Sequence, residues 1–156
     1  MAGMISHLEI LYGVDHEGES IPEINGGIRD INSGFGGEFV FLKAIRVERI
    51  YERLQPGQQN SLNSDPRRRL QYIGIERFGN GDPGKVDLAK GAGGDFRFLT
   101  FKHSLSGPGI YDVALWRSGG RQSLPPADWT GMSSDINEGR GGTYLYIVWK
   151  MDMFVF

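Results

Sequence analysis

The chain of 156 residues contains no cysteine. A disulfide framework, a cysteine–zinc site and a thiol nucleophile are therefore excluded. The lack of cysteine is typical of a reducing compartment, although a secreted protein can also do without disulfides. No run of about 18 apolar residues occurs either, so the sequence predicts no transmembrane segment.

Neither sign of charge dominates the chain. Its 17 Lys and Arg residues are matched by 19 Asp and Glu residues, and the formal net charge is −2. This balance does not favour nucleic acid, which we do not expect as a partner, and a basic patch for an anionic membrane would have to be local. The segment Met1–Tyr12 also lacks the basic start and apolar run of a secretory signal peptide.

The signatures of several enzyme classes are missing as well. The three histidines, His7, His16 and His103, have no metal-ligand spacing, and no Gly-x-Ser-x-Gly elbow occurs. A carboxylate pair from different parts of the chain could hydrolyse a glycoside, but nothing in the sequence singles out such a pair. We therefore predict a protein that is not an enzyme and has no metal or cofactor.

Glycine and aromatic residues are what the chain has in abundance. Glycine occupies 24 positions, roughly twice its average share of about 7%, and nine Phe, six Tyr and three Trp accompany it. Much glycine with many aromatic side chains is typical of short strands joined by tight turns. The composition therefore predicts an all-β protein.

One pattern occurs three times. It reads Asp, aliphatic, usually Asn, any residue, Gly, any residue, Gly, Gly, any residue, aromatic, any residue, aromatic, aliphatic. The copies are Asp30–Leu42, Asp87–Leu99 and Asp135–Ile147, and each follows a strand-like run, at His7–Val14, Leu70–Glu76 and Ile110–Trp116. We predict one domain over residues 1–156, with repeats at approximately 4–45, 68–103 and 108–151.

Two segments between the first and second copies need separate interpretation. Residues 55–69 are polar, and we interpret them as a loop insertion. The run Ala44–Leu54 has helical spacing of its apolar residues, yet it continues a strand, and we predict strand there.

Each copy has a physical interpretation. Its glycines allow backbone angles that a side chain forbids, and its Asp and Asn can hold a turn. After the double glycine, the aromatic residues alternate with others, so they share one face of a strand. The opposite face carries Val40, Arg97 and Leu145, and arginine is rarely buried without a partner. We therefore expect the aromatic faces to form the core, with rings from Phe39, Phe41, Phe96, Phe98, Tyr144 and Tyr146.

Three like units predict a body with pseudo-threefold symmetry. The candidates are a β-prism, in which three small sheets form the sides, and a β-trefoil. Trefoil repeats usually carry a Gln-x-Trp signature, which this chain lacks. We therefore predict a β-prism.

The repeated motif resembles that of one group of β-prism domains. This group includes the membrane-binding β-prism of an endosomal sorting complex subunit and the C-terminal targeting domains of perforin-like pore formers, with the jacalin-like lectins more distant. The third copy extends the resemblance through Ile110–Trp116, Pro125 and Trp129. The resemblance implies a recognition module for carbohydrates or acidic phospholipid surfaces.

We expect the glycine-rich loops to bind the ligand, because Asp, Asn and free amides suit sugar hydroxyls and an aromatic ring can stack on a sugar. The candidate residues are Asp30, Asn32, Gly36 and Gly37; Asp87, Gly93 and Gly94; Asp135, Asn137, Gly141 and Gly142; and Trp129 in an exposed loop. Ala89 replaces the Asn of the second copy, which weakens that site. The alternative is that these residues serve only the turns, which need the same residue types.

The function that we predict is lectin-like binding of cell-surface glycans. The alternative is a membrane-docking module for lipid headgroups, for example the targeting component of a pore-forming or insecticidal toxin system. Arg67–Arg69 is the only basic run in the sequence that could bind such headgroups. We expect a protein that is cytoplasmic or released without a signal peptide and acts at a membrane or cell surface. Exposed strand edges make a homodimer a further expectation.

Overall fold

The computed structural model describes residues 3–47, 68–79 and 86–152, and it confirms an all-β chain. One short 3-10 helix, η1 (Val14–Glu19), is the only helix in these ranges, and none there is long and apolar enough to cross a membrane. The strands are β1 (Met4–Tyr12), β2 (Val40–Val47), β3 (Arg69–Phe78), β4 (Phe96–Ser104), β5 (Gly109–Ser118), β6 (Gly131–Met132) and β7 (Tyr144–Asp152).

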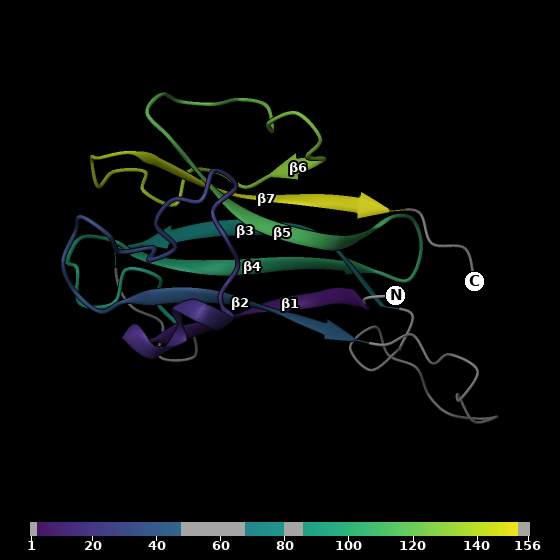
Figure 1. Cartoon of the computed structure of the whole chain (residues 1–156), viewed down its shortest axis with the longest axis horizontal. Coiled ribbons are helices and arrows are strands. Elements are labelled where there is room, and N and C mark those ends of the chain that lie inside the picture. Colours follow the sequence, from purple (N-terminus) through teal and green to yellow (C-terminus); the bar gives the residue numbers. More distant parts are fainter. Residues whose placement is uncertain (1–2, 48–67, 80–85, 153–156) are drawn as a thin grey trace.

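The strands form three small antiparallel sheets, β1-β2, β3-β4 and β5-β7-β6 (Figure 1). The long pair of each sheet has one register shift near the start of its first strand, between Ile5 and His7, between Leu70 and Tyr72, and between Ile110 and Asp112. Strands β1, β3 and β5 each contact the other two. The three sheets therefore surround a shared interior.

The strands lie close to where the sequence predicts them. Strands β2, β4 and β7 begin two or three residues after the double glycines, and β3 and β5 contain the predicted runs. The first run is shifted: β1 begins at Met4 and ends at Tyr12, because Gly13 has a φ of 113° and Val14 already starts η1. Strand is confirmed for Ala44–Val47, whereas residues 48–67, including most of the polar insertion, lie outside the described part.

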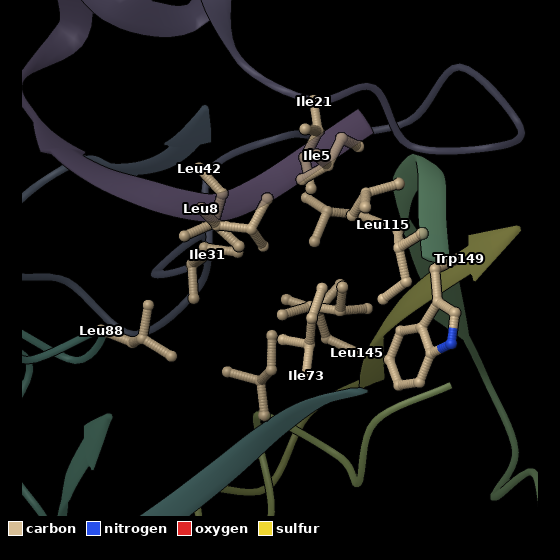
Figure 2. Close-up of a cluster of buried hydrophobic side chains, with 14 of the residues drawn as sticks. Ile5, Leu8, Ile21, Ile31, Leu42, Ile73, Leu88, Leu115, Leu145 and Trp149 are labelled. Carbon is tan, nitrogen blue, oxygen red and sulfur yellow. The ribbon is translucent and has the colours of Figure 1, made fainter. Parts of the chain in front are cut away.

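The interior is filled by aliphatic side chains from all three sheets (Figure 2). Leu42 of β2, Ile73 of β3 and Leu145 of β7 are all fully buried there, and Trp149 of β7 packs beside them, as its place in the strand predicts. Ile31, Leu88 and Ile136, which each follow the motif aspartate, are buried in the same cluster. The motif thus contributes one core residue before its glycines and more after them.

The predicted orientation of the aromatic residues is wrong. Val40, Leu42 and Leu145, on the opposite face, belong to the central cluster, whereas Phe39 is 49% exposed. Phe41 is buried, but outside that cluster, where its ring stacks on Phe39. The aliphatic faces therefore form the shared core. The aromatic faces lie on the other side of the sheets, where Phe41, Phe98 and Tyr146 are nonetheless buried, at 2% exposure or less.

Arg97 explains why the prediction fails. Its side chain is 1% exposed and occupies the position that corresponds to Val40 and Leu145. The guanidinium donates hydrogen bonds to three backbone carbonyl oxygens, those of Ile136 (2.7 Å), Asp95 (2.8 Å) and Glu138. Loop carbonyls therefore satisfy this cation inside the protein, and an arginine does not mark the solvent face here.

The connection between β1 and β2 crosses to the third sheet. Ile24 donates its amide to the Leu115 carbonyl (2.9 Å), and Leu115 donates to the Pro22 carbonyl (2.8 Å), which makes a short parallel bridge along β5. The buried Glu23 carboxylate also accepts the Arg117 amide at 3.1 Å. Strand β5 ends its sheet, so this segment covers an edge that would otherwise be unpaired.

Candidate functional site

The motif aspartates hold the glycine-rich loops with the same pair of hydrogen bonds. Asp30 Oδ1 accepts the amides of Asn32 (3.0 Å) and Val40 (2.9 Å). Asp87 Oδ1 accepts the amides of Ala89 and Arg97 in the same way, both at 2.9 Å. Asp135 Oδ1 accepts the amides of Asn137 and Leu145, also both at 2.9 Å. One carboxylate oxygen of each aspartate therefore holds the turn in the same way in all three loops.

The two motif asparagines point into the protein. Asn32 and Asn137 are each 2% exposed. Asn32 Nδ2 donates to the carbonyls of Glu38 (3.1 Å) and Lys90 (3.2 Å), and Asn137 Nδ2 donates to the carbonyl of Thr143 (2.8 Å). Their side-chain donors thus close the loops, which is the turn role that sequence analysis held as the alternative.

The three loops gather at one end of the molecule, away from the end where the N and C labels lie (Figure 1). We call residues 30–39, 87–95 and 135–143 the first, second and third loop. The first contacts the second where the Glu38 amide donates to the Lys90 carbonyl (3.0 Å). Arg97, at the end of the second loop, binds carbonyls of the third. Arg140 of the third loop donates to Asn32 Oδ1 of the first at 2.8 Å.

Gly37 shows how closely the loops approach one another. Its φ is 78°, and a Cβ there would lie 2.6 Å from backbone atoms of the second loop. Gly93 and Gly94 also have positive φ, but a Cβ on either would meet no atom within 4 Å. The equivalent double glycines therefore serve contact between loops in the first copy and leave open space in the second.

A cleft runs along the third loop. It consists of two adjoining hollows of about 130 and 250 Å³, which share Arg121, Asp135, Glu138 and Tyr144. The predicted residues Asn137, Gly141 and Gly142 line the larger one, and Ser134 and Tyr146 line the smaller. We call the two hollows the third-loop cleft.

A second opening, which we call the central pocket, lies where the loops meet. Its volume is about 350 Å³, and its lining consists of Phe35, Ala92, Gly93, Gly94, Asp95, Arg97, Gly139 and Arg140. Phe35, Ala92 and Arg140 occupy the same variable position of the three motif copies, between the first glycine and the double glycine. Gly139 lines both the central pocket and the third-loop cleft.

The pocket residues show what the sequence interpretation missed. It treated the variable position as uninformative and assigned Tyr144 to the core, although Tyr144 is only half-buried and lines the cleft. A signal was present: Phe35, Ala92 and Arg140 differ strongly within a frame that is otherwise constant. Arg121 lies outside the motif, so no repeat pattern could have found it.

Trp129 does not join the loops. It is half-buried against the cluster of Tyr146 and Val148, and the Lys150 ammonium lies 4.8 Å from its ring centroid. Since β7 begins at Tyr144, directly after the third loop, Lys150 lies about 20 Å along the strand from that loop. Trp129 therefore lines neither the third-loop cleft nor the central pocket, although it packs against the cluster that contains Tyr146 of the smaller hollow.

The basic run is not a patch of free cations. Arg67 lies outside the described residues. Arg68 Nη2 lies 2.8 Å from His103 Nδ1, and Arg69 is buried and donates to the carbonyl of Gly107. Arg69 is paired with Ser104, at the end of β4 far from the second loop.

No group of His, Asp and Glu side chains that could hold a metal ion occurs in the part of the chain that the structure describes. No protein-family model matches the chain, and no curated protein matches it either. The loop end itself therefore provides the evidence for function.

Proposed function

We propose that the chain is a non-enzymatic glycan-binding module whose three hairpins form a β-prism with pseudo-threefold symmetry. Three observations support the symmetry. Each hairpin has its register shift at a corresponding place, each motif aspartate makes the same two hydrogen bonds, and β1, β3 and β5 all contact one another. A turn held identically three times is what duplication of one folding unit produces.

The ligand site that we propose is the third-loop cleft. The observation that carries it is that Tyr144 lines the same hollows as the carboxylates of Asp135 and Glu138. A half-buried tyrosine ring can stack on the apolar face of a sugar, while carboxylate oxygens accept hydrogen bonds from its hydroxyls. Arg121, which also lines both hollows, adds donors for ring or hydroxyl oxygens.

Binding without catalysis fits the role of Asp135. Its Oδ1 makes the same turn contacts as Asp30 and Asp87, but at the motif position of Tyr144 the other two copies carry Phe39 and Phe96, which have no hydroxyl. Asp135 is thus a turn residue that also lines the third-loop cleft. In this proposal Asp135 Oδ2 and Glu138 orient the sugar and transfer no proton.

Asparagine substitution separates the two roles of the aspartate. In Asp135→Asn the amide oxygen can still accept both turn hydrogen bonds, but the negative charge of this cleft-lining side chain is lost. Asp87→Asn makes the same change in the second loop and is the matched control. We expect Asp135→Asn to weaken glycan binding about tenfold, as for the loss of one charge-assisted hydrogen bond, and Asp87→Asn to leave it unchanged.

The measurement is a glycan array with labelled wild-type protein and both variants, run beside vesicles of neutral and of anionic phospholipid. A confined set of glycans, lost in Asp135→Asn alone, would support the proposal. Equal loss in both variants would move the site away from the third loop. A blank array with binding to anionic vesicles would replace the proposal with membrane docking. Size-exclusion chromatography of the same samples tests the predicted homodimer.

A further inference from the structure

The central pocket contains cationic donors that the protein does not use. Arg140 donates through Nη2 to Asn32, and its guanidinium lies 3.9 Å from the ring centroid of Phe35. Its Nε and Nη1 are buried, and neither has a hydrogen-bond partner among the described residues. An arginine has five N–H donors, so most of those on Arg140 are left for a ligand.

Arg97 adds a second cation to the same pocket. Three carbonyl oxygens take one donor each, so at least two of its N–H groups have no partner among these bonds. Burial, followed by the positive charge of Arg97, lowers the pKa of Arg140 to about 10, although nearby aspartates oppose the shift. The two guanidinium groups thus repel each other in a confined space, and an anion between them would relieve that repulsion.

We propose that the central pocket binds the acidic group of a sugar, a carboxylate or a sulfate, on an oligosaccharide whose neutral part occupies the third-loop cleft. This inference rests on the proposed glycan binding and names the class of glycan. Gly139 borders both spaces, so one chain can extend from the cleft into the pocket. A volume of about 350 Å³ lies at the lower end of the range of ligand pockets, about 300–1,000 Å³.

The rim of the pocket favours a sugar over a membrane. Asp95 lines the pocket, and Glu38 and Glu138 lie exposed on the neighbouring loops. These carboxylates would repel the dense negative charge of an anionic bilayer, whereas sugar hydroxyls can donate to them. The cationic groups of Arg97 and Arg140 beside the carboxylate of Asp95 match a ligand that carries one anionic group among many hydroxyls.

The first test needs no variant. The neutral glycan that binds best on the array is compared with its sialylated, glucuronylated and sulfated derivatives and with the methyl esters of the two carboxylated ones, by calorimetric titration. We expect an acidic derivative to bind about tenfold more tightly than the neutral chain, and esterification to remove that gain. The carboxylated and sulfated arms show which acidic group the pocket prefers.

The second test assigns the gain to Arg140. Arg140→Gln should remove the preference for the acidic derivative and leave the affinity for the neutral glycan unchanged. Arg46→Gln is the matched control, because Arg46 also donates to oxygen acceptors, the carbonyls of Gly3 and Tyr111, but lies near the far end of β2. Melting temperatures of both variants show whether they fold, and the ester comparison decides the question if Arg140→Gln does not.

Equal binding of acidic and neutral glycans would overturn this inference and leave the proposed function intact. A preference for acidic glycans that Arg140→Gln retains while folded would also overturn it. If no glycan binds at all, both proposals fail together. Both also fail if the protein binds anionic vesicles and no acidic glycan.

Discussion

The interior between the sheets and the loop end are built on opposite plans. In the interior, corresponding positions of the three hairpins carry similar aliphatic side chains, such as Leu42 and Ile147. At the loop end, a constant frame of Asp and Gly presents Phe35, Ala92 and Arg140 at one corresponding position. The constant residues therefore define the fold, and the variable ones give its end an individual surface.

The difference between the two regions has an energetic basis. Burying an aliphatic side chain contributes a similar free energy wherever it lies, so like residues suffice in all three hairpins. Recognition depends on particular donors, charges and rings, and identical loops would present only identical surfaces. The loop end also contains buried polar atoms that have no hydrogen-bond partner within the described residues, namely Arg140 Nε and Nη1 and Asn137 Oδ1.

The largest effect is expected in the interior. Leu42→Ala removes a fully buried side chain of the central cluster and should lower the free energy of unfolding by about 2–5 kcal/mol. Phe39→Ala, on the outer face and 49% exposed, should cost less than about 1 kcal/mol. Urea denaturation of both variants measures the difference. A larger loss of unfolding free energy in Phe39→Ala than in Leu42→Ala would show that the aromatic faces form the core.

The next effect concerns the residue that joins the two regions. Arg97→Ala leaves the carbonyls of Ile136 and Glu138 without their buried donor and should lower the free energy of unfolding by about 3 kcal/mol. Arg46→Ala, which breaks exposed bonds to carbonyls, should cost less than about 1 kcal/mol. Equal urea midpoints for the two variants would show that the Arg97 contacts add nothing to stability.

The smallest effect is a pH dependence. Tyr12 donates its hydroxyl to the Asp87 carbonyl at 2.7 Å, and burial, followed by the charges of Asp87 and Glu38, raises its pKa from 10.0 to about 12. Because the folded pKa is raised, the contribution to stability is complete below about pH 10 and is lost as the pH rises through about 12. Tyr12→Phe should flatten this part of the stability curve, and ultraviolet titration of the tyrosines gives the pKa directly.

Much of the local structure follows from sequence. Glycine spacing and alternation predict where β2, β4 and β7 begin, and the turn chemistry of Asp30 is what its position between polar and glycine residues indicates. The face that points inward could not be predicted in the same way, because both faces of these strands are apolar. Arg97 then led us to predict the wrong inward face, because the loop carbonyls that accept its hydrogen bonds lie about 40 residues away in the sequence.

The candidate site was less accessible to sequence. Asp135, Asn137, Gly141 and Gly142 do line the third-loop cleft, but the partners that give it shape, Arg121 and Tyr144, come from other positions. The central pocket exists only because three loops converge, and a repeat by itself does not tell how its copies meet. The sequence interpretation also misplaced Trp129, because a sequence pattern does not tell where a loop packs on the rest of the protein.

The bridge between Glu23 and Leu115 bears on how the chain acquires its structure. The Glu23 carboxylate meets the Arg117 amide 94 residues further along the chain, so the first hairpin is completed by the last. Contacts so distant in sequence raise the contact order, which slows folding. During synthesis the connection between β1 and β2 must therefore wait for β5 to leave the ribosome before it finds its partner.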